Sequence, residues 1–249
     1  VEGCINGILK LGGALLNAGK QAIASYSDYE QLVGGVETLF KDSSGIVENY
    51  ANNAYKTAGL SANEYMDTVT SFSASLLQSL NGDTAKSAEV ADKAITDMSD
   101  NANKMGTSME SIQNAYQGFA KQNYTMLDNL KLGYGGTKSE MERLIGDANK
   151  LAKAQGQAGN LTIESYADVV EAIHLVQDNM GITGTTAKEA STTIQGSIGA
   201  MKSAWSNLLT GMADENANFD TLMENLIDSI GTVIQNIVPK VKIVIDSII

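Results

Sequence analysis

Apolar side chains recur at every third or fourth position along most of the chain, which is the spacing of one face of an α-helix. Such stripes run from Met109 to Phe119 and from Met141 to Leu151. Short alternating runs of β-branched and aromatic residues, which indicate strands, are rare. The pattern predicts an all-α protein, a multi-helix bundle of about eight or nine amphipathic helices with more than two thirds of its residues helical.

Helix starts are predicted by capping boxes, in which a Ser or Thr hydroxyl and a Glu three residues later satisfy each other's free backbone N–H groups. The pairs are Ser61 with Glu64, Thr107 with Glu110, Thr137 with Glu140, and Thr186 with Glu189. Asp83, and either Asp42 or Ser43, are predicted as simpler caps. Glycine-containing segments predict the breaks between helices. These breaks are expected at residues 59–60, 81–82, 105–106, 133–136, 155–160 and 181–184.

The longest apolar stripes lie in the C-terminal part of the chain. One is predicted as a single helix from Ala187 to Met212. It contains Trp205, the only tryptophan, which we expect to be a buried packing anchor or, alternatively, a contact with a partner. The next stripe runs from Phe219 to Ile248, and Pro239 is expected to break or kink this longer helix because its ring clashes with the preceding turn.

This last stripe lacks a following sequence that could cover it. Burying half of its large side chains is worth several kcal/mol, at about 1.5–3 kcal/mol each. We therefore predict that residues 215–249 self-associate between copies of the chain or, as the less favoured outcome, dock on the chain's own bundle. The expected contact residues are Trp205, Phe219, Leu226, Ile230 and Ile237.

Composition shifts near Gly133 and divides the chain into three expected regions. Residues 1–132 are expected to form short helices rich in Ala and Ser, and residues 133–214 a helical core. Residues 215–249 are expected to form an amphipathic helix that continues into a further C-terminal part. The chain opens at Val1 and stops at Ile249 within an apolar run, so we interpret it as a piece of a longer protein.

Charge and composition narrow the classes of function. The net charge of −12 leaves no broad basic face, so we expect no specific nucleic-acid partner. The single cysteine, Cys4, cannot form an internal disulfide. Residues 5–24 are the most hydrophobic stretch, but Lys10 and Lys20 interrupt it before the roughly 20 apolar residues that a membrane span needs.

His174 is the only histidine, and it lies on a predicted helix between Glu171 and Asp178. These carboxylates, three residues before and four residues after it, favour a charged imidazole at the edge of an apolar stripe. No nucleophile is placed beside it by local spacing. We expect a structural or surface role, and replacement by Gln should leave the fold nearly intact.

Two other patterns also fail to predict chemistry. Residues 133–139 superficially resemble a phosphate-binding loop, but Thr137 stands between the glycines and Lys138 and is better explained as a helix cap. Glu140 and Glu142 point to different sides of a helix, so no carboxylate pair for glycoside hydrolysis stands out. We expect no catalytic residue, no metal site and no cofactor, and we predict that the chain is not an enzyme.

Two stretches resemble phage tail tape measure proteins of long-tailed phages and prophages. They are GYGGTKSEMERLIGDANKL, residues 133–151, and YADVVEAIHLVQDNMGITGTTAKEASTTIQGSIGAMKSAWSNLLTGMAD, residues 166–214. The resemblance implies a structural protein, several parallel copies of which lie in the tail lumen and set tail length while the tube polymerises around them. It implies other copies of the chain, tail tube and tail tip proteins, and tail assembly chaperones as partners. The implied locations are the virion and, during assembly, the cytoplasm of the bacterial host.

Two alternatives remain open. The resemblance also implies a protein that leaves the tail at infection and helps the genome to cross the host envelope. Residues 4–24 and 226–249 would then form a membrane-active helical segment that makes transient membrane contact. The second alternative is a cell-wall hydrolase domain, which the tail setting suggests, although no catalytic pair stands out among the 29 acidic residues.

Overall fold

The computed structural model describes residues 2–248, and it describes side-chain surroundings within residues 17–243. The described chain forms ten α-helices and two short 3-10 helices without a strand, and more than two thirds of it is helical, so the predicted all-α class is confirmed. The elements are α1 (Glu2–Phe40), η1 (Lys41–Ser43), α2 (Ser44–Thr57), α3 (Ala62–Ser79), α4 (Thr84–Met105), α5 (Met109–Phe119), η2 (Leu127–Leu130), α6 (Lys138–Ala154), α7 (Tyr166–Asn179), α8 (Thr185–Thr192), α9 (Ile194–Gly211) and α10 (Phe219–Ile248).

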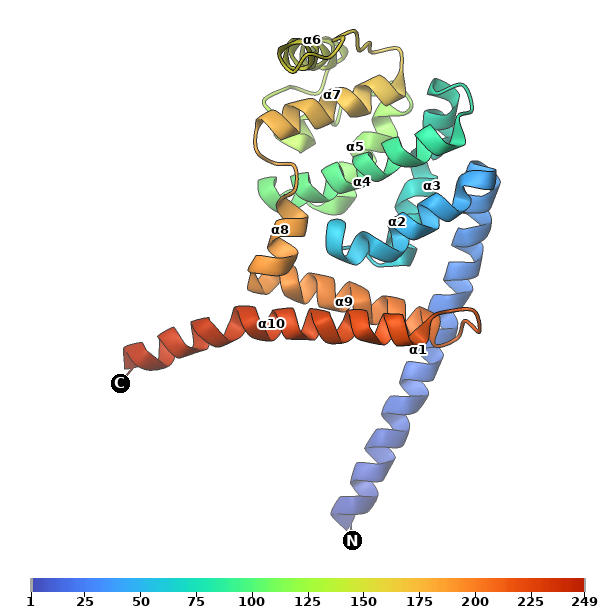
Figure 1. The fold of residues 1–249 in the computed structure, drawn as a ribbon, viewed down its shortest axis with the longest axis vertical. Helices are drawn as coiled ribbons and strands as arrows, with labels where there is room; N and C mark the ends of the chain where they lie inside the picture. Colours follow the sequence, from blue (N-terminus) through green and yellow to red (C-terminus); the bar gives the residue numbers. More distant parts are fainter. Residues whose placement is uncertain (1, 249) are drawn as a thin grey trace.

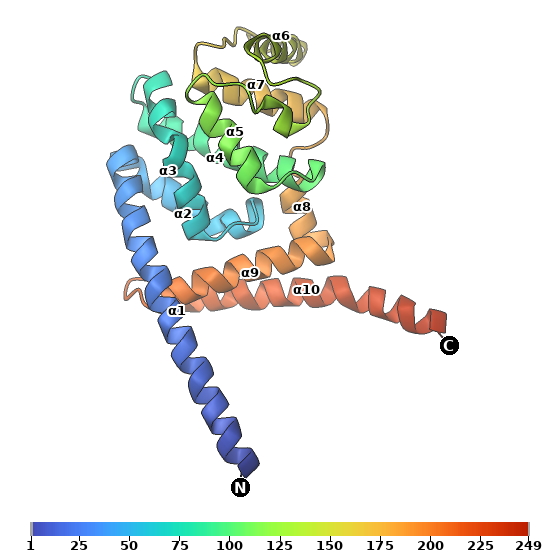
Figure 2. The same cartoon turned by 180° about the vertical axis from the view of Figure 1, so that it is seen from behind.

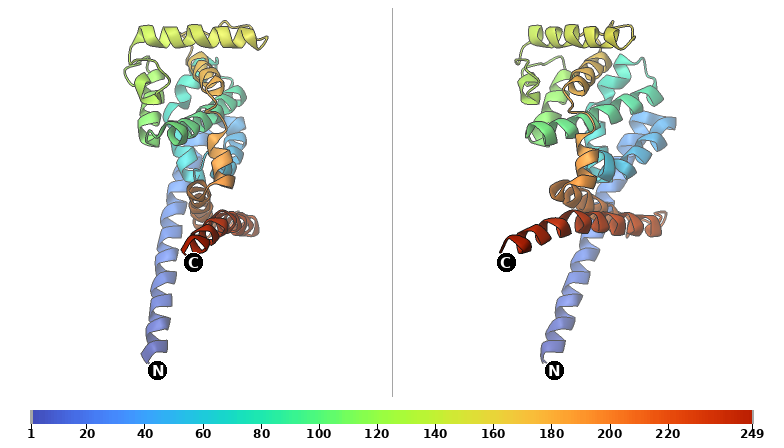
Figure 3. Two further views of the ribbon diagram at one scale, coloured as in Figure 1. Left: turned by 90° about the vertical axis from the view of Figure 1, so that its left-hand side faces the viewer. Right: turned by 60° about the vertical axis from the view of Figure 1, so that its left-hand side comes forward.

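Figure 1 shows a helical body from which two long helices extend. Helices α2 to α8 and the C-terminal half of α1 form the body, while the N-terminal half of α1 projects away from it (Figures 1 and 2). Helices α9 and α10 run antiparallel along the end of the body where α1 leaves it, and the C-terminal end of α10 extends beyond α9. Figure 3 shows α6 lying across α7 at the opposite end.

The main hydrophobic core runs through the body from Val36 in α1 to Ile182 after α7. Tyr65 and Tyr116 are among its largest fully buried side chains. Because this core contains residues before and after the Gly-rich segment 133–136, the packing of the body is continuous across the place where the composition shifts.

Most of the predicted local signals for helix ends are present. Ser61 and Glu64 form the expected capping box, with each residue's backbone N–H donating to the other's side chain. Asp83 caps α4, and Thr137 caps α6. The predicted glycine-containing breaks all fall between helices. At the end of α4, for example, Gly106 adopts a φ of 66°, a left-handed conformation that glycine allows without a steric cost.

Two predicted caps are wrong, and one lacks its hydrogen bond. Helix α5 is capped by Ser108, one residue after the predicted Thr107, whose hydroxyl instead donates to the carbonyl of Asn129. Thr186 lies inside α8 rather than before it. Ser43 precedes α2 as expected, but its hydroxyl bonds to that of Thr84 and not to the helix.

The C-terminal helices also differ from the prediction. The expected single helix from residue 187 to residue 212 is wrong, because Thr193 adopts an extended conformation between α8 and α9. Its hydroxyl accepts the N–H of Gly196 and so caps α9. Helix α10 is one helix rather than two segments, with Pro239 inside it, and it curves over its C-terminal part (Figure 1).

Candidate interaction surface

Helix α9 contacts the body through small and polar side chains. Ser203 donates to the carbonyl of Gly59 at 2.9 Å, and Asn207 accepts the N–H of Ala62 at 2.8 Å. One helical turn further on, the hydroxyls of Thr210 and Ser25 are hydrogen-bonded. These residues recur at the spacing of one helical face, so α9 is bound to the ends of α2 and α3, and to α1, by directional polar contacts.

Several large apolar side chains of this stripe do not face the body. Ile194 and Trp205 of α9, and Met212 directly after it, are exposed, Trp205 to 45%, whereas Leu208 and Leu209 are buried. The expectation that Trp205 is a buried packing anchor is therefore wrong. The alternative, that Trp205 contacts a partner, stays a prediction.

Helix α10 packs against α9 with one of its faces. Leu226 lies in a small hydrophobic cluster with Ala204 and Leu208 of α9 and Tyr55 of α2. Near the other end of α9, the side-chain amide of Asn236 donates to the carbonyl of Thr193 at 3.1 Å. The part of this segment from Leu222 to Asn236 thus docks on the chain's own fold, which is the less favoured of the two predicted outcomes.

A second face of α10 is not covered by the chain. Among the predicted contact residues, Phe219 and Ile230 are exposed, and Ile237 is half-buried. Leu226 is only 8% exposed, so within this fold it contributes to packing on α9. The uncovered face also includes residues that were not singled out before. These are Ile227, Ile234, Val238 and Val241.

Amide side chains gather in a cavity of about 350 Å³ beside the connection between α9 and α10. Asn207 and Asn218 line it, but each already accepts a backbone N–H, from Ala62 and Thr221 respectively. Asn207 therefore holds α9 to the start of α3, and Asn218 holds the start of α10 in place.

His174 forms an ion pair that local spacing did not predict. Its Nδ1 lies 3.0 Å from the carboxylate of Asp97 on α4, which is 1% exposed. The hydrogen bond with Asp97 raises the pKa of His174. Burial raises the pKa of Asp97, and the hydrogen bond from His174 opposes this rise. The structural role expected for His174 therefore depends mainly on Asp97, whereas Glu171 pairs with Lys93.

Two further polar side chains of α4 connect it to α7 and α8. The buried amide of Asn101 donates to Gln177 at 2.7 Å, and Gln177 donates to the carbonyl of Asp97. Asp100, which is fully buried, accepts the N–H groups of Gly184 and Thr186 at the start of α8. Polar residues spaced three or four apart on α4 therefore fix the position of α8, and α9 follows directly from it.

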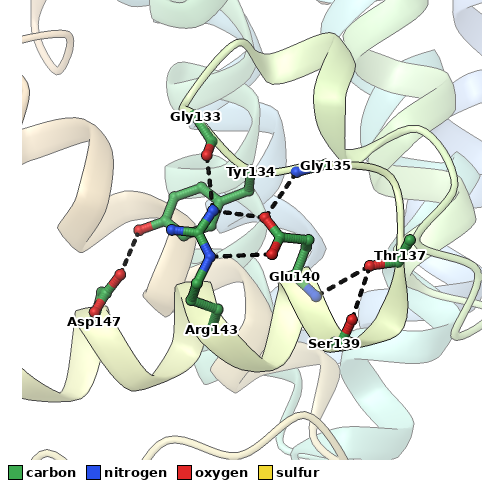
Figure 4. A network of polar contacts seen from close by, with 8 residues as sticks. All are labelled: Gly133, Tyr134, Gly135, Thr137, Ser139, Glu140, Arg143 and Asp147. Carbon is green, nitrogen blue, oxygen red and sulfur yellow. Dashed lines mark hydrogen bonds and ion pairs between the residues drawn. The ribbon is translucent and has the colours of Figure 1, made fainter.

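Figure 4 shows polar contacts within residues 133–147, which comprise the loop before α6 and the first half of that helix. Arg143, the only arginine, donates to both carboxylate oxygens of Glu140 and to the carbonyl of Gly133. Its guanidinium lies 4.2 Å from the ring centroid of Tyr134. Glu140 also accepts the N–H of Gly135, so these contacts close the loop onto the start of α6.

The charges of this network are satisfied within it. Hydrogen bonds from Arg143 and from the N–H of Gly135 hold the pKa of Glu140 below its ordinary value. Burial and a hydrogen bond to Asp147 raise the pKa of Tyr134 to about 12. Because Glu140 is fully engaged by its neighbours, we assign the network to the shape of the loop.

Among the residues that the structure describes, no helix combines the length and apolar character that a membrane span requires. The same residues contain no group of three or more His, Cys, Asp or Glu side chains placed to hold a metal ion.

Comparison with known proteins identifies no family or function for this surface. The chain matches no protein-family model, no curated protein and no solved structure.

Proposed function

We propose that this chain is a structural, non-enzymatic segment of a phage tail tape measure protein, which helps to set tail length while the tail tube assembles around several copies. Residues 133–151 and 166–214, which resemble this family, belong to α6, α7, α8 and α9 and the connections beside them. In this proposal the partners are other copies of the chain, tail tube and tail tip proteins, and tail assembly chaperones. The protein is made in the host cytoplasm and lies in the tail lumen of the virion.

The observation that carries the proposal is the uncovered apolar face of α10, from Phe219 to Val241. A helix with such a face favours neighbours that other chains supply, because large contiguous apolar surfaces are rare on monomers. The net charge of −12 supports the same function, since an acidic protein does not hold the DNA that passes through the same lumen.

Purified tails from a phage or prophage that encodes this chain provide the test. Mass spectrometry should detect peptides of residues 17–243 in the particles. Deleting helical residues from the full-length protein should shorten the tails by about 1.5 Å per residue, measured by electron microscopy. A Glu142→Gln variant, altered only at an exposed position, should have tails of normal length. Absence of the peptides, or tails of unchanged length after deletion, would contradict the proposal.

A second candidate function is contact between α10 and a membrane surface. It is favoured by the exposed apolar face and by two exposed lysines beside it, Lys240 and Lys242. Leakage of anionic or neutral lipid vesicles in the presence of the protein would support this function. Absence of binding to either kind of vesicle would exclude it.

A further inference from the structure

The uncovered face of α10 has a symmetric arrangement of residues. Its apolar side chains at Ile227, Ile230, Ile234, Val238 and Val241 are between 39% and 58% exposed. Successive residues of an α-helix are rotated by about 100° around its axis, so all five side chains project within about 40° of the direction in which Ile234 projects. They form one narrow stripe. Ile234 is at its centre, both in position along the helix axis and in direction around that axis.

The apolar residues of the stripe have the same spacing before and after Ile234 along the chain. Ile227 and Val241 lie seven residues before and after Ile234, and Ile230 and Val238 lie four residues before and after it. A second α10 that runs antiparallel and is aligned on Ile234 places an apolar residue opposite each of these positions. Ile230 and Val238 point to opposite sides of the contact, so they interdigitate rather than collide. Such a surface is complementary to itself about a two-fold axis.

Charged residues beside the stripe favour the same arrangement. Glu224 and Lys242 are exposed, and both project about 80° to the same side of Ile234. In the antiparallel pair, Lys242 of the second copy comes to the level of Glu224 on the same flank, and symmetry repeats this contact. In a parallel, in-register pair, Glu224 and Lys242 face the apolar flank of the other helix instead. Charge complementarity therefore selects the antiparallel orientation.

The rest of the fold leaves room for this contact. The face of α10 that packs on α9, marked by Leu222, Leu226 and Ser229, points about 120° away from Ile234. The two bodies would then lie toward opposite ends of the paired helices, both on the flank opposite Glu224 and Lys242. From this geometry we propose that α10 mediates a two-fold, antiparallel dimer of this chain, centred on Ile234.

This inference goes beyond the proposed function and does not depend on it. The resemblance to tape measure proteins implies copies that run in the same direction, whereas the α10 pair holds two copies in opposite directions. The dimer is thus the form of the free chain in solution. Because a single pair of helices makes a small interface, its dissociation constant should be on the order of micromolar.

Sedimentation of the chain at micromolar concentrations tests the dimer. The unaltered chain should pass from monomer to dimer over this range, and Ile234→Asp should remain monomeric. The matched control is Ile243→Asp, because Ile243 is 61% exposed but lies on the opposite side of the same helix. Circular dichroism should show equal helicity for all three proteins. A chain that stays monomeric throughout, or a dimer that withstands Ile234→Asp, would overturn the proposal.

Disulfide trapping tests the orientation. In a Cys4→Ser background, Ile227→Cys and Val241→Cys proteins are mixed and oxidised at a concentration where the dimer forms. The antiparallel pair should yield mainly the mixed, cross-linked dimer. Disulfides mainly between two Ile227→Cys chains would establish a parallel pair and overturn the proposal. It would equally be overturned if the stripe bound lipid vesicles in an Ile234-dependent manner while the free chain did not self-associate.

Discussion

The carboxylate of Asp100 accepts a hydrogen bond from the backbone N–H of Thr186 at 2.7 Å, across 86 positions of the sequence. The same carboxylate accepts the N–H of Gly184 at 2.6 Å. The first N–H groups of a helix have no partner within it and favour a negative charge. A side chain of α4 therefore caps α8, which explains why Thr186 and Glu189 do not form the capping box that their spacing predicts.

Replacing Asp100 by Ala should lower the free energy of unfolding by about 2–4 kcal/mol, because it leaves two N–H groups at the start of α8 without acceptors. Urea denaturation measures this change. Asp178→Asn, on the exposed side of α7, is the control and should have almost no effect. If Asp100→Ala lowers the free energy of unfolding no more than the control does, α8 does not need this cap.

Local signals in the sequence predicted the helices well, and long-range contacts explain where they failed. Ser61 and Thr137 were predicted correctly as caps, because their backbone partners lie three residues away. Asp100 and Asp97 could not be identified as partners of α8 and His174, because only the fold brings them together.

The candidate surface shows the same limit. Helical spacing revealed the apolar stripes of α9 and α10, but it does not tell which face a neighbouring helix covers. Trp205 is exposed because Ser203, Asn207 and Thr210 make the contacts with the body. Apolar spacing predicts burial for Trp205 because spacing alone ignores the hydrogen bonds that small polar residues can form.

Stability should depend on pH through His174. Its pKa is raised in the folded chain, so the stabilisation from its pairing with Asp97 is fully present below about pH 6.5, the ordinary pKa of histidine. It is lost as pH rises through the folded pKa. The raised pKa of Asp97 acts in the same direction. Urea denaturation from pH 5.5 to 9 should show the free energy of unfolding falling as pH rises. The His174→Gln protein should fold but lack most of this pH dependence. An NMR titration placing the folded pKa of His174 below 6.5 would refute the prediction.

Gly196 should tolerate no side chain, because an added Cβ would overlap the backbone of Glu189 and Ala190 in α8. Gly196→Ala should reduce the free energy of unfolding by about 1–3 kcal/mol. Gly199→Ala, one turn further along α9 with open space around it, should increase that free energy by about 0.5–1 kcal/mol. Thermal or urea denaturation compares the two. Equal effects would show that α8 and α9 do not approach each other as closely as the fold places them.

Arg143→Lys should loosen the loop before α6 without unfolding the chain. Lysine cannot donate to both carboxylate oxygens of Glu140 and also lie flat over Tyr134. The N–H of Gly135, which donates to Glu140, should therefore exchange with deuterium faster. Global stability should change little, because exposed ion pairs contribute little. Glu142→Gln, on the solvent side of α6, should leave this exchange rate unaltered. An unchanged rate in Arg143→Lys would show that the arginine does not hold the loop.

The crossing of α1 and α9 determines how the chain would bear mechanical tension. The N-terminal arm of α1 and the far end of α10 leave the molecule in different directions (Figure 1). A pull on these two ends reaches α9 directly from α1, where the hydroxyls of Ser25 and Thr210 are bonded. The body from α2 to α8 does not lie on the path along which this force is transmitted. It stays unstretched until α9 separates from α1 and from the ends of α2 and α3, so the polar contacts of Ser203, Asn207 and Thr210, rather than the large core, would set the force at which the chain begins to lengthen.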